Sequence, residues 1–567
     1  MVHKLVFIGM GGVGRTFLEM LPMTDLVPKS YWQNIIIIEP RDLSEEPTIK
    51  RLVEKKISIE IVPIEITSGN IRYLLNKYVQ KSDIVIDVSY NIDFAPLIGY
   101  CFEIGAMYIN TSMECYPTEG DEILEDRLYD RTLHYMHEDV NALERKFLKT
   151  YSTLPTAIVM HGMNPGLVSH FVKLELHKIG DTILKLAHKY ELKSPSLAVL
   201  KKACDTDDFA TMAYIMQLRV VHCSERDTQL AKMARKQGEF MNTWGPYSFW
   251  AEGIDPIQIG IGTHESQSID ETKTVVINGK RFEVQMPSSK PFNQIYAKIR
   301  GIDVMFESYV PITDKHGELV TTSSGGYKSG LIKGMAIPHC ENDSCNRYLS
   351  LYAGEAKHPS GEINDKPKTG EQGKLIYRPS NYYVYSPCKA AWESFQEIRS
   401  NKYKMLPIQH SLRGFEIKSG EDAVGALLIF EMNPLSHLLL CSTGLDGHDP
   451  KSKNYDVKLA ERITKKIKEL SRGSESNNSF WTGTILSIDE TRNLGIKYSG
   501  PTTVQVGISL LSAIHWMLKN KNKGLVYPES IPYRDILKHS FPWLGRIFCD
   551  FVPYRVKDMT LKALSDV

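Results

Sequence analysis

Four carboxylates and one tryptophan are the side chains of this sequence with the most informative chemistry. The acids are Asp93, Glu114, Glu225 and Glu252, and the tryptophan is Trp244. Carboxylates neutralise ammonium groups and the face of an indole attracts a cation, so a site built from them would suit a cationic organic substrate. Taken singly, each acid is more often a solvated surface carboxylate, and Trp244 is as often a residue of the core or of a dimer interface.

A glycine-rich turn near the N-terminus is expected to position a nucleotide. Leu5–Ile8 is a short apolar run, typical of a strand buried on both faces, and GMGGVG follows it directly. In this G-x-G-x-x-G pattern Gly9 permits a tight turn, Gly11 lets a pyrophosphate approach, and Gly14 lets the next helix pack closely. The phosphates would lie at the helix N-terminus, which favours anions. The expected cofactor-binding residues here are Gly9, Gly11, Gly12, Val13 and Gly14.

A second apolar run, Ile35–Ile38, ends in Glu39. This glutamate stands at about the distance from the glycines at which dinucleotide-binding folds place the acid that contacts the adenosine ribose. It would repel a 2′-phosphate and therefore favours NAD. Arg41 could accommodate that phosphate, which leaves NADP as the alternative. A glycine turn in some other α/β protein is the less favoured interpretation.

Further apolar runs extend this pattern to six strands with helices between them. The later runs are Ser58–Thr67, Asp83–Val88, Ala106–Ile109 and Ala157–Met160. This alternation predicts an α/β fold with a Rossmann-type doubly wound parallel sheet. Ligands bind outside the carboxyl ends of the strands in such sheets. The residues expected to face one crevice there are Ser89, Asp93, Asn110, Thr111, Glu114 and Asn164.

The remaining chain predicts a second, α+β domain. Short alternating runs between Lys273 and Met305 indicate an antiparallel sheet. The expected division is an NAD-binding domain at 1–160, a substrate and dimerisation domain at 161–500, and a C-terminal extension at 519–567. The apolar stretch 502–518 predicts a helix that returns to pack on the first domain. Two polar segments, 352–374 and 451–478, are interpreted as insertions.

Composition argues against several classes of protein. The 567 residues include 68 basic and 67 acidic side chains, so no global field favours nucleic acid or an anionic membrane as a partner. No apolar run is long enough to span a bilayer, and the chain enters a strand without a signal peptide. Nine scattered cysteines, none at common zinc-binding spacing, predict reduced thiols in a cytoplasmic protein without a metal site.

The histidines give a less specific signal. His339, in the sequence GMAIPHCE, could be a proton shuttle or a structural histidine. His161 and His264 are expected to be structural, holding loops through hydrogen bonds of the ring. No histidine pair has helical metal-ligand spacing, and no nucleophilic serine or cysteine motif is present.

Several motifs resemble those of the bacterial-type homospermidine synthases, which are relatives of the saccharopine dehydrogenase-like oxidoreductases. The resemblance covers nearly the whole chain, but it departs from the family pattern in the two insertions and around Asp93. It does not extend to the plant homospermidine synthases. The motifs are HGMNPGLVSHF at 161–171, SERDTQ at 224–229, NTW at 242–244, EG at 252–253 and GTHE at 262–265.

The resemblance implies a reaction and a set of roles. NAD would be held as a prosthetic group. Two putrescines, or spermidine and putrescine, would be joined into homospermidine with release of ammonia or diaminopropane. An amine would be oxidised to an imine, exchanged with a second amine, and reduced again by the same cofactor. The resemblance and the predicted antiparallel sheet also imply a homodimer.

By their place in the motifs, Trp244 would stabilise iminium charge and Glu252 would anchor a distal ammonium. Glu114 and Asn164 would position the reacting amine. Residues matched to proton transfer are Glu225 and His339, and Asp93 is matched more loosely to the amine site.

Two other functions are consistent with the same sequence. A saccharopine or carboxynorspermidine type of NAD(P) dehydrogenase would release its reduced cofactor, and arginines should converge on its carboxylated substrate. A non-catalytic NAD-binding regulator would keep the glycine turn but should have lost the acids and Trp244.

Overall fold

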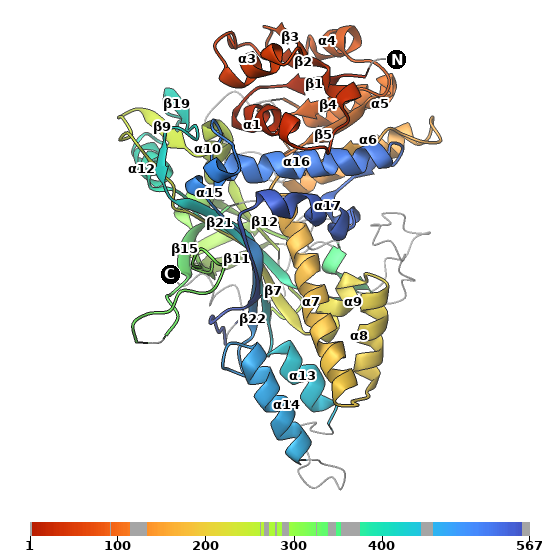
Figure 1. Ribbon diagram of the computed structural model, residues 1–567, viewed down its shortest axis with the longest axis vertical. Helices are drawn as coiled ribbons and strands as arrows, with labels where there is room; N and C mark the ends of the chain where they lie inside the picture. The colour runs from red at the N-terminus through yellow and green to blue at the C-terminus, as the bar shows by residue number, and fades with distance from the viewer. Residues whose placement is uncertain are drawn as a thin grey trace.

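Two β-sheets form the framework of the protein, with a long helix between them (Figure 1). The structure is a computed structural model. It describes residues 3–90, 92–113, 133–260, 262–265, 272–277, 280–285, 294–324, 326–337, 348–352, 375–443, 457–557 and 559.

The first sheet has seven strands, all parallel, in the order β23-β6-β5-β4-β1-β2-β3. Its central strands β1 and β4 are fully buried and, except for Asp87, apolar because helices cover both faces, as in other parallel sheets. The order reverses between β1 and β4, which creates a crevice at their carboxyl ends. The predicted α/β Rossmann-type fold is confirmed. The strands are β1 (Leu5–Ile8), β2 (Asn34–Ile38), β3 (Ser58–Val62), β4 (Ile84–Asp87), β5 (Met107–Asn110), β6 (Ala157–Ile158) and β23 (Leu525–Val526).

The helices of the first sheet follow its strands in sequence. The first, α1, starts at the glycine turn and has its apolar side against the sheet and α16. The described helices are α1 (Gly12–Met20), α2 (Lys29–Trp32), α3 (Pro47–Glu54), α4 (Ile71–Tyr78), α5 (Phe94–Ile104) and α6 (Leu133–Phe147).

The second sheet is mixed and has eleven strands. Its path is β11-β12-β13-β10-β18-β7-β21-β22-β24, and β15 pairs with both β14 and β18. The pair β7–β18 is parallel, whereas β7–β21 and β21–β22 are antiparallel. The strands are β7 (Leu218–Asp227), β10 (Pro256–Gly260), β11 (Thr272–Ile277), β12 (Lys280–Gln285), β13 (Gln294–Arg300), β14 (Met305–Tyr309), β15 (Leu331–Ala336), β18 (Ser380–Ser386), β21 (Glu421–Phe430), β22 (Ser479–Ser487) and β24 (Arg546–Phe551).

Three two-stranded sheets and several helices complete this part of the chain. The long helix α7 packs on β21 and β22, and α8, α9 and α13 pack on α7. The small sheets are β8 (Leu230–Ala231) with β20 (Ile417–Ser419), β9 (Glu239–Asn242) with β19 (Ile408–Ser411), and β16 (Leu351–Tyr352) with β17 (Leu375–Tyr377). The helices are α7 (Leu167–Lys189), α8 (Pro195–Asp205), α9 (Phe209–Ile215), α10 (Pro246–Ile254), α12 (Lys389–Ser400), α13 (Pro434–Cys441), α14 (Val457–Leu470), α15 (Ile488–Asn493) and α17 (Tyr533–Ser540).

Helix α16 (Pro501–Lys519) lies between the two sheets and packs on α1 (Figure 1). A Cβ atom at Gly507 would lie 3.1 Å from Thr16 Cγ2, so the two helices approach closely. The residues after α16 return to both sheets, since β23 pairs with β6 and β24 pairs with β22. The division into domains at 1–160, 161–500 and 519–567 stays a prediction. Among the described helices, none is both long and apolar enough to cross a membrane.

A buried carboxylate fixes α1 to the chain just before α16. The Glu19 side chain is 2% exposed and accepts hydrogen bonds from Lys497 N–H at 2.7 Å, Tyr498 N–H at 3.1 Å and the Ser499 hydroxyl at 2.8 Å. These three donors lie between α15 and α16, so Glu19 joins α1 to a part of the chain that is far away in sequence.

We expect Glu19→Ala to lower the free energy of unfolding by about 3 kcal/mol, because three donors lose their acceptor inside the protein. Urea denaturation followed by tryptophan fluorescence would measure this loss. The control is Glu54→Ala, whose side chain is exposed at the end of α3 and should leave the transition unchanged. Equal transitions for the two variants would contradict the role given to Glu19.

Candidate functional site

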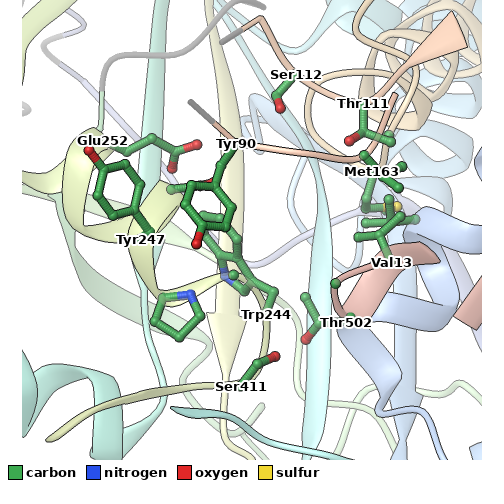
Figure 2. A pocket seen from close by; sticks show the side chains of 18 of the residues that line it. Val13, Tyr90, Thr111, Ser112, Met163, Trp244, Tyr247, Glu252, Ser411 and Thr502 are labelled. Atoms are coloured by element: carbon green, nitrogen blue, oxygen red, sulfur yellow. The ribbon is translucent and has the colours of Figure 1, made fainter. Parts of the chain in front are cut away.

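A cavity of about 420 Å³ lies between the carboxyl edge of the parallel sheet and the mixed sheet (Figure 2). The parallel sheet contributes the glycine turn and the loops after β4 and β5. The mixed sheet contributes β7, β18 and the segment leading into α10. Of the residues proposed from the sequence, those that line the cavity are Gly11, Gly12, Val13, Ser89, Thr111, Asn164, Glu225, Trp244 and Glu252.

The glycine turn has an open face toward this cavity. Gly9 has a φ of +82°, and a Cβ there would lie 2.8 Å from Ser89 Cα, so a side chain does not fit. A Cβ at Gly11 would have no neighbour within 4 Å, whereas one at Gly14 would lie 3.2 Å from Val88 Cγ2. The helix therefore packs tightly at Gly14 and leaves space at Gly11. That space, at the N-terminus of α1, can hold a phosphate.

Glu39 is held by its neighbours at the glycine turn. Its carboxylate accepts the Met10 N–H at 2.8 Å and the Arg41 Nε–H at 2.7 Å, and Arg41 also donates to the Met10 carbonyl at 3.1 Å. Burial alone would raise the pKa of Glu39, but hydrogen bonds and charge from Arg41, with the Met10 N–H, hold it below its ordinary value. Glu39 is thus ionised and already bonded, and Arg41 lines the cavity. Its contact with a ribose stays a prediction.

The opposite end of the cavity contains a three-membered hydrogen-bond network. Asn164 Nδ2 donates to Glu225 Oε2 at 2.6 Å and to the Tyr383 hydroxyl oxygen at 2.6 Å. The Tyr383 hydroxyl donates to the same Glu225 oxygen at 2.6 Å. Parallel pairing of β7 with β18 places Glu225 and Tyr383 on neighbouring strands, and Asn164 comes from the loop before α7. The network fixes one carboxylate oxygen and directs two donors toward it.

Glu225 is one of three buried carboxyl groups on β7 and β21. Asp227 is two residues further along β7, and Asp422 pairs with Asp227 in the antiparallel register. Burial raises the pKa of Glu225 to about 7, against hydrogen bonds from Tyr383 and Asn164. Burial also raises the pKa of Asp422, and the charges of Glu225 and Asp227 raise it further. Three carboxylates this close cannot all be ionised, so the group retains a proton near neutral pH.

Trp244 and Glu252 lie at the two ends of the α10 segment. Trp244 directly precedes the cap of α10, and its indole N–H donates to the Tyr385 hydroxyl at 3.4 Å. Phe249 supports the indole, with ring centroids 5.1 Å apart. Figure 2 shows Trp244 and Glu252 among the side chains around the same cavity. In the sequence, only the family resemblance related Trp244 to Glu252. In the fold, both residues line the same cavity.

Two tyrosines narrow the cavity from opposite sides. Tyr90 follows β4 of the parallel sheet and Tyr247 is in α10, and their rings stack at 5.1 Å with an interplanar angle of 27° (Figure 2). Sequence reasoning missed this pair because it links residues far apart in the chain. Other lining or adjoining residues that it missed include Arg15, Asp227, Tyr383, Ser411, Arg413 and Asp422. Of these residues, only Asp227 belongs to a motif that the sequence analysis identified, SERDTQ.

Some proposed residues lie elsewhere. Asp93 is the N-cap residue of α5 and is not among the cavity-lining residues. Asn110 is buried behind the cavity, where its side chain accepts the Met160 N–H at 2.7 Å and donates to the Tyr108 hydroxyl at 3.1 Å. Glu114 and His339 lie outside the described residues, as does most of the insertion at 352–374.

Away from the cavity, three potential metal ligands come together in the described chain. Ligand atoms of His177, Asp181 and Cys204 lie within 4.8 Å of one another. His177 Nε2 is already hydrogen-bonded to Asp207 at 2.6 Å, and the Arg534 guanidinium lies 3.5 Å from it. A bound cation would therefore have to displace an existing positive charge.

Comparison with known proteins gives one family match and two full-length relatives. Residues 5–154 match the saccharopine dehydrogenase NADP binding domain. The chain is 25% identical over 558 residues to the homospermidine synthase of Mesorhizobium japonicum, covering 97% of this chain and 91% of that protein. It is 24% identical over 562 residues to the homospermidine synthase of Blastochloris viridis, covering 97% and 92%.

A solved structure shares the whole fold. The homospermidine synthase of Legionella pneumophila, solved in complex with NAD, superposes with a TM-score of 0.67 at 23% identity and covers 98% of this chain and 92% of that one. The fold and the cavity thus define a Rossmann protein with a saccharopine dehydrogenase-type first domain. The resemblance to the homospermidine synthases that the motifs indicated is confirmed over nearly the whole chain.

The raised pKa of Glu225 predicts a pH dependence of stability. The folded protein keeps this proton up to about pH 7, whereas an unfolded glutamate loses it near its ordinary pKa, so the folded state binds more protons in between. Between about pH 5 and about pH 8, the free energy of unfolding of wild type should therefore fall by about 3 kcal/mol relative to that of Glu225→Gln. Urea denaturation at several pH values measures this. Glu461→Gln, at an exposed position of α14, should parallel wild type, and a parallel course for Glu225→Gln would contradict the assignment.

Proposed function

We propose that this protein is a homospermidine synthase that joins two putrescines, or spermidine and putrescine, and releases ammonia or diaminopropane. One observation carries the proposal: the open space at Gly11 and three side chains suited to a cation, Glu225, Trp244 and Glu252, line the same cavity. The two relatives that match it over 97% of its length bear this name.

The residues at the glycine turn fit a dinucleotide. Gly11 and Gly12 leave the N-terminus of α1 accessible, and Thr111 and Ser89 line the adjoining wall. NAD is the proposed cofactor, as in the Legionella protein that was solved with NAD. When bound, it would accept a hydride from an amine carbon and later return it to the new imine, so the net redox change is zero.

The side chains at the other end hold and deprotonate the amine. A primary amine must lose its ammonium proton before its carbon can give up a hydride. Glu225 is the proposed acceptor, because its pKa lies near neutral and Asn164 and Tyr383 hold its oxygen in place. Glu252 would anchor the distal ammonium, and the indole face of Trp244 would stabilise the iminium charge. Roles for Asp93, Glu114 and His339 in the same steps stay predictions.

The distribution of arginines favours a cationic substrate. The arginines that line the cavity are Arg15, Arg41 and Arg413. Arg15 lies in the first turn of α1, Arg41 contacts the Met10 carbonyl, and Arg413 contacts Glu46 at the start of α3. All three therefore belong to the glycine-turn end, whereas Glu225 and Glu252 belong to the other. A saccharopine-type dehydrogenase would need arginines beside its carboxylated substrate, so it is the less favoured candidate.

We also propose, from the resemblance alone, that the protein is a cytoplasmic homodimer. Light scattering coupled to size exclusion should give twice the mass of one chain, and a monomer would contradict the dimer.

Incubation with putrescine and NAD should yield homospermidine and ammonia without net NADH. Mass spectrometry of the amines and absorbance at the NADH band measure both. Glu252→Gln should reduce turnover about hundredfold and Trp244→Ala about thirtyfold or more, with bound cofactor retained, because each removes stabilisation of a cation. Glu393→Gln, at an exposed position of α12, should turn over normally.

The other outcomes each contradict the proposal in a different way. Stoichiometric NADH without homospermidine would indicate an ordinary amine dehydrogenase. No reaction at all would favour a carboxylated-substrate dehydrogenase or a regulator. Normal turnover by both variants would contradict the assignment of the site.

A further inference from the structure

A segment of the chain outside the parallel sheet reaches the glycine turn. Strand β19 pairs in parallel with β9, just before Trp244, and its end enters the cavity. The lining of the cavity includes Gln409, His410, Ser411 and Arg413. Figure 2 shows Ser411 among the side chains around it. Ser411 Oγ lies 3.4 Å from the place where a Cβ of Gly12 would be, so it lies close to the first residue of α1.

The Ser411 hydroxyl has no hydrogen-bond partner although its oxygen is buried. A buried hydroxyl without a partner is unfavourable, and it normally finds a donor or an acceptor. The cap of α1, Gly11, gives no side-chain hydrogen bond to the first turn, so unpaired N–H groups face the same space. A phosphate oxygen placed there would accept from both the hydroxyl and the helix N-terminus.

Positive charge surrounds this space from two parts of the fold. Glu46, the N-cap of α3, is 5% exposed and lies between two arginines: its Oε2 is 3.3 Å from Arg413 Nη2 and 3.9 Å from Arg15 Nε. With Arg41 there are three guanidinium groups around the turn. Burial lowers the pKa of Arg15, and the charges of Arg413 and Arg41 also act to lower it, against the charges of Glu46 and Glu39. An anionic diphosphate would relieve the repulsion among these guanidinium groups.

The segment is held firmly in this position. His410 bonds to Glu239 at 2.8 Å and to Glu416 at 3.1 Å, and the Arg413 N–H donates to Glu416 at 2.8 Å. The next residue, Gly414, donates its N–H to the Tyr498 carbonyl at 2.9 Å. Tyr498 belongs to the stretch that Glu19 of α1 binds. The serine and the arginine are thus preorganised against the parallel sheet.

We infer that Ser411 and Arg413 bind the diphosphate of the dinucleotide from the side opposite the glycine turn and hold the cofactor between the two sheets. The inference rests on the proposed function only in that a dinucleotide must bind. The contact between Arg413 and the diphosphate would then have to break before the cofactor could dissociate. Segment 409–413 would therefore determine how long the cofactor stays bound over many turnovers.

The test is the dissociation rate of NADH from the full chain. NADH fluorescence is followed after addition of excess NAD, and bound nucleotide is counted after gel filtration. Arg413→Gln should speed dissociation about tenfold to hundredfold, because a charge-assisted bond is lost. Ser411→Ala should speed it about fivefold. The matched control is Arg219→Gln, which breaks an ion pair with Glu431 on the mixed sheet outside the cavity and should release NADH at the wild-type rate.

Each outcome decides the inference. Wild-type rates for both Ser411→Ala and Arg413→Gln would overturn it while leaving the proposed function intact. Wild type that binds no dinucleotide would overturn both. If Arg413→Gln does not fold, Arg413→Lys and Ser411→Ala decide, because each keeps most of the packing. If Arg413→Gln changed the dissociation rate of NADPH but not that of NADH, Arg413 would lie at the 2′-phosphate, and the assignment to the diphosphate would be overturned.

Discussion

One cavity has to accommodate opposite charges at its two ends without letting them neutralise each other. Arginines surround the glycine turn, and carboxyl groups gather around Glu225 and Glu252. Ion pairs between these sets would remove both binding ends at once. The fold keeps them apart: Arg15 and Arg41 belong to the parallel-sheet part of the chain, Arg413 follows β19, and Glu225 lies on β7 of the mixed sheet. Within each end, a neighbouring side chain already binds the charged group. Glu39 accepts a hydrogen bond from Arg41, Glu46 forms an ion pair with Arg413, and Glu225 accepts a hydrogen bond from Asn164.

Burial makes this separation chemically useful. At the acidic end, three carboxyl groups on adjacent strands have lost most of their water, so protonation is cheaper than ionisation for at least one of them. A site of this kind can take a proton from an ammonium group and return it later without a proton from bulk solvent. The aromatic wall of Trp244, Phe249 and Tyr385 supplies no competing charge and leaves the indole face as the partner of a cation.

The sequence was sufficient for six of the seven strands of the parallel sheet, but not for β23 of the C-terminal extension or for the shape of the site. Runs such as Leu5–Ile8 are apolar because they are covered on both faces, and GMGGVG has a mechanism at each glycine, so both could be identified directly. Motif resemblance predicted Asn164, Glu225 and Trp244, which all line the cavity. Contacts between residues on different strands could not be predicted from the sequence. Asp422 meets Asp227 only through the register of β21 with β7, and no local pattern encodes that register.

The same limit applies to Arg413 and Ser411, which reach the glycine turn through the pairing of β19 with β9. Asn110 shows the opposite error. Its place at the end of β5 predicted a residue facing the crevice, but its side chain turns back to the Met160 N–H and the Tyr108 hydroxyl. Topology places a residue at the correct edge of a sheet, whereas the direction of the side chain depends on which buried polar groups need a partner.

The two late strands, β23 and β24, have a consequence for how the protein is made on the ribosome. Each adds the last strand at one end of a sheet: β23 pairs with β6 and β24 pairs with β22. While residues 525–551 are still to be translated, β6 and β22 of the nascent chain lack these partners and expose unpaired backbone groups. Final assembly of the two sheets is therefore postponed until synthesis of these strands. Until then the growing polypeptide is exposed to wrong strand pairing and is a natural client for chaperones that shield such edges.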